Sequence, residues 1–239
     1  MINTAFYLFS PQIRQVLQEM GNAARDIGGD LVPYLAENDY PVYGYPVKGY
    51  WIDIATPERL HKASMDCLEG KIKHFDRKYQ FQPNQWIHPS TLTKIEKYLQ
   101  NGEIKLSGNV SIGRNCCIEK GAVIENSHIG HTSLIERNVE VRDSIIMSFG
   151  NIRRDVFINR AIVGRHSTIE AHSELNADQP HRNSRVPVVG ENVVLPTESI
   201  VGPGIRVAPL KHAHNILATG RFIEMGIDDR NIYFTEKSG

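Results

Sequence analysis

The chain has 239 residues and no formal net charge, because 27 Lys and Arg side chains balance 27 Asp and Glu side chains. This length predicts one or two domains with a real core, and the balanced charge gives no global field that would recruit nucleic acid or a membrane surface. No apolar run approaches the ~18 residues that span a bilayer, and the N-terminus lacks a signal-peptide pattern. The three cysteines form no CxxC pair, so a soluble, cytoplasmic protein with reduced cysteines is expected.

Residues 1–70 have the pattern of mixed α/β structure. Apolar and aromatic runs predict short strands at 3–9 and within 41–53. Helical spacing of apolar residues predicts three helices in the same part of the chain, at 10–20, 31–37 and 56–68.

Two of these helices carry start signals. Ser10 is expected to be an N-cap with Pro11 at the first helical position. Thr56 and Pro57 form the same kind of start for the third helix, which is expected to stop at Gly70.

Residues 71–102 are polar, rich in Lys and Gln, and interrupted by prolines. They are expected to form a partly ordered linker, with a helix at 92–99. The weak periodicity before that helix predicts little other regular structure.

Residues 103–210 carry the strongest pattern in the chain, an aliphatic residue at every fifth or sixth position from Val110 to Leu175. A helix repeats its buried face at 3.6 residues and a strand at 2, so this period fits neither. Short strands joined by regular corners, as in a parallel β-helix of hexapeptide repeats, fit it instead. About 18 residues for each coil would give roughly five coils.

Glycine often follows the aliphatic residue of a repeat, which suits corners with positive φ. The repeats break between 176 and 187 and then resume, and the tail at 211–239 is expected to cap the last coil. The glycines in question are Gly113, Gly130, Gly164 and Gly190.

The N-terminal part carries three sequence blocks: NTAFYLFSPQI, then DIGGDLVPYL, then PVYGYPVKGYWIDIATPERL. Their order resembles the last third of the catalytic domain of sugar-1-phosphate nucleotidyltransferases. That family includes mannose-1-phosphate guanylyltransferases and glucose-1-phosphate adenylyltransferases. Several members carry a C-terminal left-handed β-helix, so the resemblance implies a partial α/β nucleotidyltransferase domain followed by a left-handed β-helix.

The resemblance implies transfer of a nucleotide from an NTP to a sugar 1-phosphate with release of pyrophosphate. It places Asp53, in WIDIAT, as one of two carboxylates that hold Mg²⁺, and Asn3 and Thr4 at the sugar. Mg²⁺ prefers a few carboxylates together with phosphate oxygens, where it neutralises charge between two reacting anions. By its position alone, Asp53 could equally cap the helix that starts near Pro57.

The family's Gly-rich phosphate loop, of the type GGxGTRL, has no counterpart in this sequence. The first metal carboxylate and the segment that grips the sugar phosphate should lie upstream of Asn3. We therefore expect a truncated nucleotidyltransferase that is weak or inactive alone, because most donors to the transferring phosphoryl group are missing.

Two other functions stay open from the sequence. In hexapeptide acyltransferases a corner histidine acts as a general base, and His166, His172 and His181 are the candidates, although histidines at solvated corners need no function. The flat sides of the β-helix could instead have a non-catalytic role in assembly or regulation. We then expect the chain to form a homo-oligomer through the β-helix.

Two charged groups have alternative interpretations. Asp26 and Asp30 are more readily explained as helix N-cap residues than as ligands. Four arginines near one another in the sequence suggest an anionic effector site or, more simply, a solvated face: Arg153, Arg154, Arg160 and Arg165.

Overall fold

A computed structural model describes residues 4–72, 79–176, 185–208, 223–227 and 232–236. The chain divides into two compact units, unit 1 (Met1–Asp53) and unit 2 (Ile54–Gly239). Each unit is described by itself.

The regular structure of unit 1 is helical over its described residues, and residues 4–9 and 41–53 are irregular. It contains α1 (Ile13–Met20), a 3₁₀ turn (Gly21–Ala23), a π-helical turn (Ile27–Leu31) and α2 (Val32–Glu37). Its small core is formed by Val16, Leu31 and Leu35.

The predicted second helix is confirmed by α2, and the first by α1, but the start of α1 differs from the prediction. The N-cap of α1 is Gln12, without a side-chain cap. The Ser10 hydroxyl instead donates to Gln12 Oε1 at 2.6 Å. Pro11 therefore lies in the turn that precedes the helix and not at its first position.

The strand predictions for 3–9 and 41–53 are wrong over the described residues 4–9 and 41–53, which contain no strand. A strand is held by hydrogen bonds to a neighbouring strand. The described part of unit 1 contains no neighbouring strand, so these apolar runs form no sheet.

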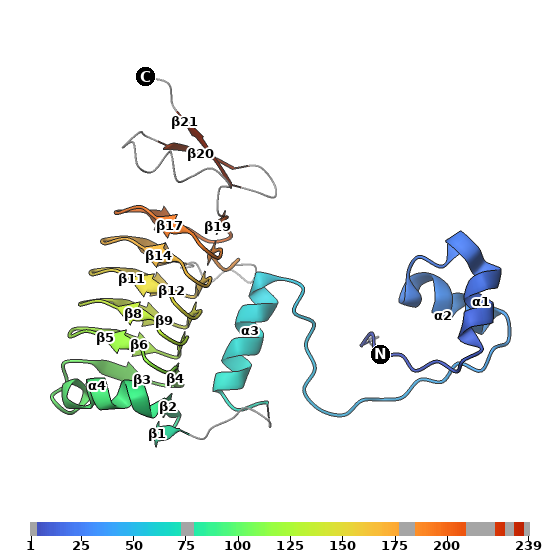
Figure 1. The fold of residues 1–239 in the computed structure, drawn as a ribbon, viewed down its shortest axis with the longest axis horizontal. Helices are drawn as coiled ribbons and strands as arrows, with labels where there is room; N and C mark the ends of the chain where they lie inside the picture. Colours follow the sequence, from blue (N-terminus) through green and yellow to red (C-terminus); the bar gives the residue numbers. More distant parts are fainter. Residues whose placement is uncertain (1–3, 73–78, 177–184, 209–222, 228–231, 237–239) are drawn as a thin grey trace. The chain divides into compact units, whose positions relative to one another are not determined.

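Unit 2 is a left-handed parallel β-helix, which confirms the fold predicted from the repeats. Three sheets run along the stack of coils (Figure 1). Sheet A has the order β1-β2-β4-β7-β10-β13-β16-β19, sheet B β18-β15-β12-β9-β6-β3, and sheet C β17-β14-β11-β8-β5. All pairs within these sheets are parallel except β1 with β2.

The strand bounds show how short each side of a coil is. Sheet A holds β1 (Gln80–Gln82), β2 (Gln85–Ile87), β4 (Val110–Ile112), β7 (His128–Ile129), β10 (Ile145–Ile146), β13 (Ile162–Val163), β16 (Val188–Val189) and β19 (Arg206–Val207). Sheet B holds β3 (Lys105–Ser107), β6 (Val123–Glu125), β9 (Glu140–Arg142), β12 (Phe157–Asn159), β15 (Glu174–Asn176) and β18 (Ile200–Val201). Sheet C holds β5 (Cys117–Ile118), β8 (Leu134–Ile135), β11 (Asn151–Ile152), β14 (Thr168–Ile169) and β17 (Val194–Leu195). A separate antiparallel hairpin joins β20 (Ile223–Ile227) and β21 (Ile232–Glu236).

Five complete coils follow from this order, from β4–β6 to β16–β18, as predicted. The coil length differs from the expected 18 residues, because stacked residues in the central coils are 17 apart. The corner that leads into sheet A is one residue shorter than the other two. Across the interruption that follows β15, the spacing of stacked residues grows to 26.

Each coil sends one aliphatic residue of every strand into the core, where Ile124, Ile135, Ile146 and Leu175 are fully buried. Burial of such a side chain contributes roughly 1.5–3 kcal/mol, which explains why the period is so regular.

The glycines after the aliphatic residues have a different role from the one expected. The positive φ values at the corners belong mainly to other residues, among them Thr132, His166 and His172. At Gly164, which lacks a positive φ, an added Cβ would lie 2.5 Å from the backbone carbon of Gly190 in the next coil. Close stacking of backbones, and not the φ angle, is what requires glycine there.

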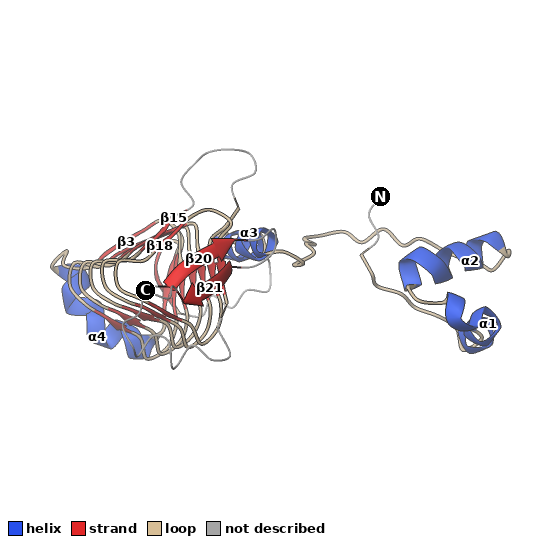
Figure 2. Cartoon of the chain, turned by 90° about the horizontal axis from the view of Figure 1, so that it is seen from above, coloured by secondary structure: helices blue, strands red, loops and turns tan. Residues whose placement is uncertain are grey.

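Two helices pack against the coils. α4 (Pro89–Gln100) lies at the end of the stack that holds β3 and β4, and its Ile95 is 1% exposed within the core cluster (Figure 1). α3 (Pro57–Leu68) lies outside the stack, alongside sheet A, as Figure 2 shows from above. The segment expected to be a linker thus carries β1, β2 and α4 on the coil stack.

Candidate functional site: the face of the β-helix that carries α3

The third predicted helix is confirmed by α3, with the expected start and stop. The Thr56 Oγ1 atom accepts a hydrogen bond from Arg59 N at 3.3 Å, and Gly70 follows the helix with φ +81°. The helix therefore begins shortly after Asp53, the predicted metal ligand.

α3 is held on sheet A by an apolar contact. Ile145 and Ile162 turn outward from the sheet, yet they are only 4% and 2% exposed. They form a separate cluster with Val186, against which Leu60 and Met65 of α3 pack. This cluster anchors the helix to the coils.

A polar contact fixes the same helix. His61 Nε2 lies 2.5 Å from the carbonyl oxygen of Asp143, at the corner between β9 and β10. Burial lowers the pKa of His61, and the nearby Arg160 guanidinium lowers it further, whereas the hydrogen bond to Asp143 raises it. The imidazole is therefore neutral at pH 7, and its Nε2–H donates to the carbonyl.

Both ends of α3 carry further polar contacts. Glu58 Oε1 accepts a hydrogen bond from Val186 N at 3.4 Å. Asp66, which is 3% exposed, forms ion pairs with Lys62 and Lys71, both at 2.7 Å. A buried carboxylate needs such partners, so Asp66 is structural.

A shallow hollow lies where the start of α3 meets sheet A. Its walls are mostly apolar and carry one carboxylate, that of Glu191. The lining residues include Ile54, Thr56, Pro57, Met147, Ile162 and Val188. These residues offer no donor set for a phosphate or a metal ion.

The metal and sugar ligands inferred from the sequence stay predictions. Asp53 is exposed in a segment without regular structure, Thr4 is half-buried, and Asn3 lies outside the described residues. Among the described residues, no three His, Cys, Asp or Glu side chains come close enough to hold a metal ion. The described residues therefore do not fit Mg²⁺ by themselves.

The histidines proposed for acyl transfer are also separate. His166 and His172 lie at two different corners of one coil, on either side of β14. The His166 ring stacks on Phe149 with centroids 4.5 Å apart, and His172 Nδ1 lies 3.9 Å from Asp155 Oδ2. His181 lies outside the described residues.

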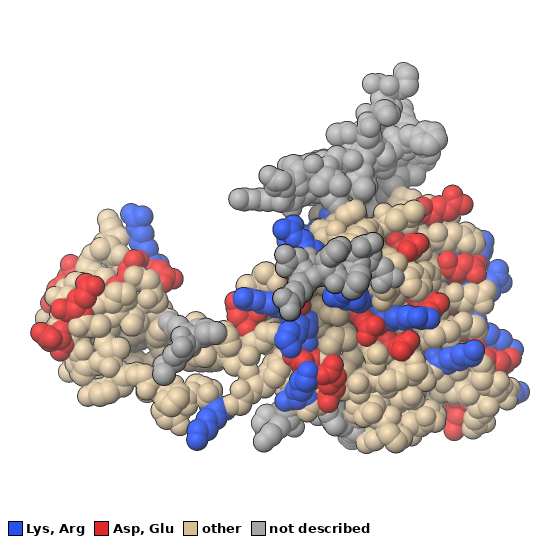
Figure 3. Space-filling model, turned by 180° about the vertical axis from the view of Figure 1, so that it is seen from behind, with Lys and Arg blue, Asp and Glu red and all other residues tan. Residues whose placement is uncertain are grey.

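The arginines expected to form one basic group are divided among the three corners of the coils. Arg153 and Arg154 follow β11, Arg160 precedes β13 and Arg165 follows β13. Arg153 pairs with Glu136 at 2.9 Å. Acidic and basic side chains also alternate over the visible face of unit 2 (Figure 3), so the solvated-face interpretation fits better.

Asp26 and Asp30 are helix-capping residues, as expected. Asp26 Oδ1 accepts from Gly29 N at 2.5 Å, and Asp30 Oδ2 accepts from Asp26 N at 2.8 Å. Cys67, Cys116 and Cys117 form no disulfide within the part of the chain that the structure describes.

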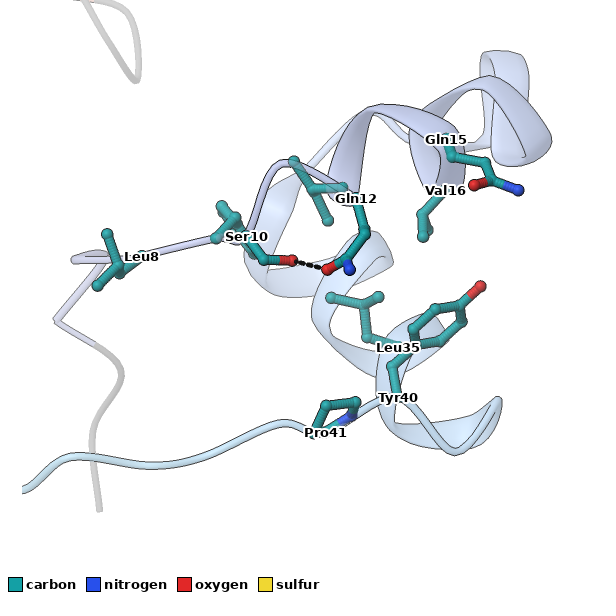
Figure 4. Close-up of a pocket in the computed structure, with 10 residues that line it drawn as sticks. Leu8, Ser10, Gln12, Gln15, Val16, Leu35, Tyr40 and Pro41 are labelled. Atoms are coloured by element: carbon teal, nitrogen blue, oxygen red, sulfur yellow. Dashed lines mark hydrogen bonds between the residues drawn. The ribbon is translucent and has the colours of Figure 1, made fainter.

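Unit 1 has a pocket of its own, between residues 8–16 and residues 35–41 (Figure 4). Leu8, Val16 and Leu35 lie on its walls, and the Ser10–Gln12 hydrogen bond crosses its rim. The pocket contains no acidic or basic side chain among its lining residues.

Sequence reasoning missed the anchor of α3, although a signal was present. At β10, β13 and β16 two aliphatic residues stand together in three successive strands of one sheet, whereas the doubled aliphatic residues of β17 and β18 leave Val194 and Ile200 exposed. Doubled aliphatic residues repeated in successive strands of one sheet indicate that its other face is covered as well.

Residues 106–223 match the family model described as GMPPB C-terminal domain. Glucose-1-phosphate adenylyltransferase of Desulforamulus reducens is 30% identical over 190 residues, which cover 75% of this chain and 44% of that protein. The protein of the same name from Bacillus cereus is 28% identical over 176 residues, covering 69% of this chain and 43% of that protein. The chain thus spans less than half the length of these relatives.

This chain is similar to the C-terminal portion of a sugar-1-phosphate nucleotidyltransferase. The matched region covers 75% of the chain, which is more than the coils occupy, so the similarity extends beyond the β-helix. These matches confirm the resemblance to the C-terminal portion of a sugar-1-phosphate nucleotidyltransferase that the sequence blocks indicated.

Solved structures give weaker matches. The acetyltransferase domain of PglB from Neisseria gonorrhoeae, in complex with acetyl coenzyme A, matches with a TM-score of 0.43 and 10% identity over 54% of this chain and 56% of that one. PerB from Caulobacter crescentus, in complex with CoA and GDP-perosamine, matches with a TM-score of 0.26 and 12% identity over 80% and 87%. TM-scores below 0.5 support no statement about what this chain binds. Among the described residues, no helix is both long and apolar enough to cross a bilayer.

Proposed function

We propose that this chain works as the C-terminal portion of an enzyme that transfers a nucleotide from an NTP to a sugar 1-phosphate and releases pyrophosphate. The supporting observation is the 30% identity over 190 residues to a glucose-1-phosphate adenylyltransferase. The nucleotide and the sugar are left open, because the chain matches both an adenylyltransferase and the GMPPB domain.

The β-helix acts in this proposal as a rigid support. The chain passes from Asp53 through Thr56 into α3, and α3 is anchored on sheet A by its apolar cluster and by His61. Groups that must meet a substrate within a fraction of an ångström work best on rigid elements. The coil stack therefore fixes the helix that follows the predicted ligand.

The exposed side chains of unit 1 support the proposal that this chain is part of a larger protein. Its large apolar side chains are unusually open to solvent: Phe6 is 81% exposed, Leu8 100%, Tyr43 89% and Tyr45 88%. Large apolar side chains that are left open to solvent together on one small unit point to a contact with other protein. We infer that unit 1 completes its fold, and its chemistry, only against further residues of a nucleotidyltransferase.

Asp53 is proposed as one ligand of Mg²⁺ in that complete enzyme, with Thr4 and Asn3 near the sugar. Mg²⁺ supplies charge neutralisation between phosphate groups when it is bound. A single carboxylate does not make a Mg²⁺ site, so the remaining ligands must come from outside the described residues.

Pyrophosphate release tests the proposal. The 239-residue chain is assayed with MgCl₂, ATP or GTP, and glucose or mannose 1-phosphate, alone and mixed with a separate polypeptide that carries a Gly-rich phosphate loop. We expect little turnover alone and clear turnover in the mixture, because the chain lacks that loop.

Asp53→Asn in the mixture should reduce turnover by about 10²-fold or more, in the range seen when one charge-stabilising group is removed. Asp39→Asn is the matched control, because Asp39 is also an exposed residue of unit 1. Loss of turnover by both variants, or its absence from every mixture, would count against the proposal.

A homo-oligomer formed through the β-helix belongs to the same proposal. Two outward aliphatic residues of the last coil, Val194 and Ile200, are 48% and 73% exposed. Light scattering on the purified chain tests it, and Ile200→Lys should shift an oligomer toward the monomer. A monomer at every concentration would refute it.

A further inference from the structure

A second hollow lies on a part of unit 2 that α3 does not reach, between α4 and the first two coils. α4 contributes Lys94, Ile95 and Tyr98 to this hollow. Strand β5 contributes Cys117 and Ile118, and the corners after β5 and β8 contribute Glu119, Lys120 and Arg137. Three cationic side chains from three separate segments thus meet around one apolar floor.

The carboxylates near this hollow have other partners. Glu103 Oε1 lies 2.9 Å from Lys120 Nζ, which also lies 5.2 Å from the centre of the Tyr98 ring. Glu119 Oε2 accepts a hydrogen bond from the backbone N–H of Arg137 at 3.0 Å. Within the described residues, neither the Lys94 ammonium nor the Arg137 guanidinium forms an ion pair. These two cations are left to face the hollow.

The repeat shows why the hollow ends at the second coil. Lys120, Arg137 and Arg154 occupy the same corner position in three successive coils, since Asn138 N donates to Lys120 O and Asp155 N donates to Arg137 O. Only the first two of these cations line the hollow beside α4. Arg154 lies one coil further along, and its Nε atom is 3.9 Å from Asp155 Oδ2.

We propose that this hollow is a binding site for a phosphorylated small molecule, with Lys94 and Arg137 at its phosphate group. A guanidinium offers a planar pair of N–H donors that matches two phosphate oxygens, and an ammonium adds a point charge. Ile95 and Ile118 provide an apolar surface for the rest of the molecule, as binding sites commonly do. The site is separate from the predicted Mg²⁺ ligand and does not depend on nucleotidyl transfer.

Calorimetric titration of the full chain, without NTP or Mg²⁺, tests the site. The probes are glucose 6-phosphate, inorganic phosphate and glucose, each at low salt and at 150 mM salt. We expect glucose 6-phosphate to bind more tightly than inorganic phosphate and glucose not to bind, because the cations dominate and the apolar floor adds to them. Higher salt should weaken binding, since both cations are near the surface.

Arg137→Gln and Lys94→Gln should each weaken glucose 6-phosphate binding by about tenfold or more, the effect of losing a hydrogen bond to a charged group. Arg154→Gln is the matched control, because it removes the equivalent charge one coil away, and it should bind as the unchanged chain does. Circular dichroism checks that each variant is folded.

Three results would overturn the site: no binding of either phosphate probe, equal binding by all variants, or equal loss in the Arg154→Gln control. The last of these would mean a general attraction of anions to the corner. Failure of the pyrophosphate-release assay would leave these titrations unaffected, so the two proposals are tested apart.

Discussion

His61 Nε2 lies 2.5 Å from the carbonyl oxygen of Asp143, which is 82 residues further along the chain. This contact joins α3 to a corner of the β-helix where the imidazole is 9% exposed. The helix and the coil stack therefore share a buried polar contact that depends on a neutral histidine.

The first prediction is that attachment of α3 weakens in acid. Burial lowers the pKa of His61 in the folded chain, so the unfolded chain takes up a proton that the folded chain resists. The stabilising contribution is complete above the ordinary histidine pKa of about 6.5 and is lost as pH falls below it. Urea unfolding at pH 7.5 and pH 5.5 measures the difference.

Arg160 adds to this effect because its charge opposes that of a protonated His61, whereas Asp143 acts in the opposite sense. Burial lowers the pKa of His128 to about 4, so this histidine also makes the free energy of unfolding fall as the pH falls. His61→Gln keeps a donor for the carbonyl without titrating, so it should lose part of the pH slope. His172→Gln, at an exposed corner, is the matched control, and the same slope in the His61→Gln variant as in the unchanged chain would contradict the prediction.

The second prediction concerns the anchor of α3. Ile162→Ala removes a buried outward side chain beneath Leu60 and Met65 and should lower the free energy of unfolding by about 2–4 kcal/mol. Trypsin should then cut α3 faster at Arg59 and Lys62. Val194→Ala, an outward residue of sheet C that is 48% exposed, is the control and should change little. Equal effects of the two substitutions would show that α3 does not cover sheet A.

The third prediction concerns the stacked glycines. Gly164→Ala places a Cβ 2.5 Å from the backbone of Gly190, so two coils must separate, which should destabilise the chain by about 1–3 kcal/mol or more. Gly202→Ala meets only Ile205 Cδ1 at 3.8 Å, an ordinary contact. Thermal unfolding of both variants measures the contrast, and equal midpoints would contradict close backbone stacking.

The fourth prediction concerns the serines inside the corners. Ser144 is fully buried, its Oγ accepts from Ala161 N at 3.0 Å, and its N–H donates to Ser127 Oγ at 3.0 Å. Ser144→Ala leaves the Ala161 N–H without its acceptor, which should cost about 1–3 kcal/mol. Ser107→Ala, at an exposed position, should stay within about 0.5 kcal/mol of the unchanged chain. Urea unfolding decides, and a stable Ser144→Ala variant would show that this hydrogen bond is dispensable.

The β-helix could be predicted because its information is local. Each coil repeats the same aliphatic position and the same corner, so about six residues carry the whole rule. The one-residue shortening at the corner into sheet A is present in the spacing from Ile124 to Ile129 and could have been counted. The role of Gly164 could not, because it depends on a backbone in the next coil.

The candidate site was predicted less well. Asp53 was identified from its neighbours in the sequence, but a metal site needs several ligands brought together from different segments, and the described residues hold no group of three such ligands. The hollow beside α4 was missed because Lys94 and Arg137 are 43 residues apart by their numbering and meet only when α4 closes the first coil.

The sequence by itself determined the coil period, the helices α1 to α4 and the resemblance to nucleotidyltransferases, since periodicity, capping residues and motif blocks act over a few neighbouring residues. Tertiary structure alone decided which sheet is covered by α3, that residues 4–9 and 41–53 form no strand, and which cations face a hollow. These outcomes depend on partners far away in the chain, and a strand or a binding site exists only where such a partner is present.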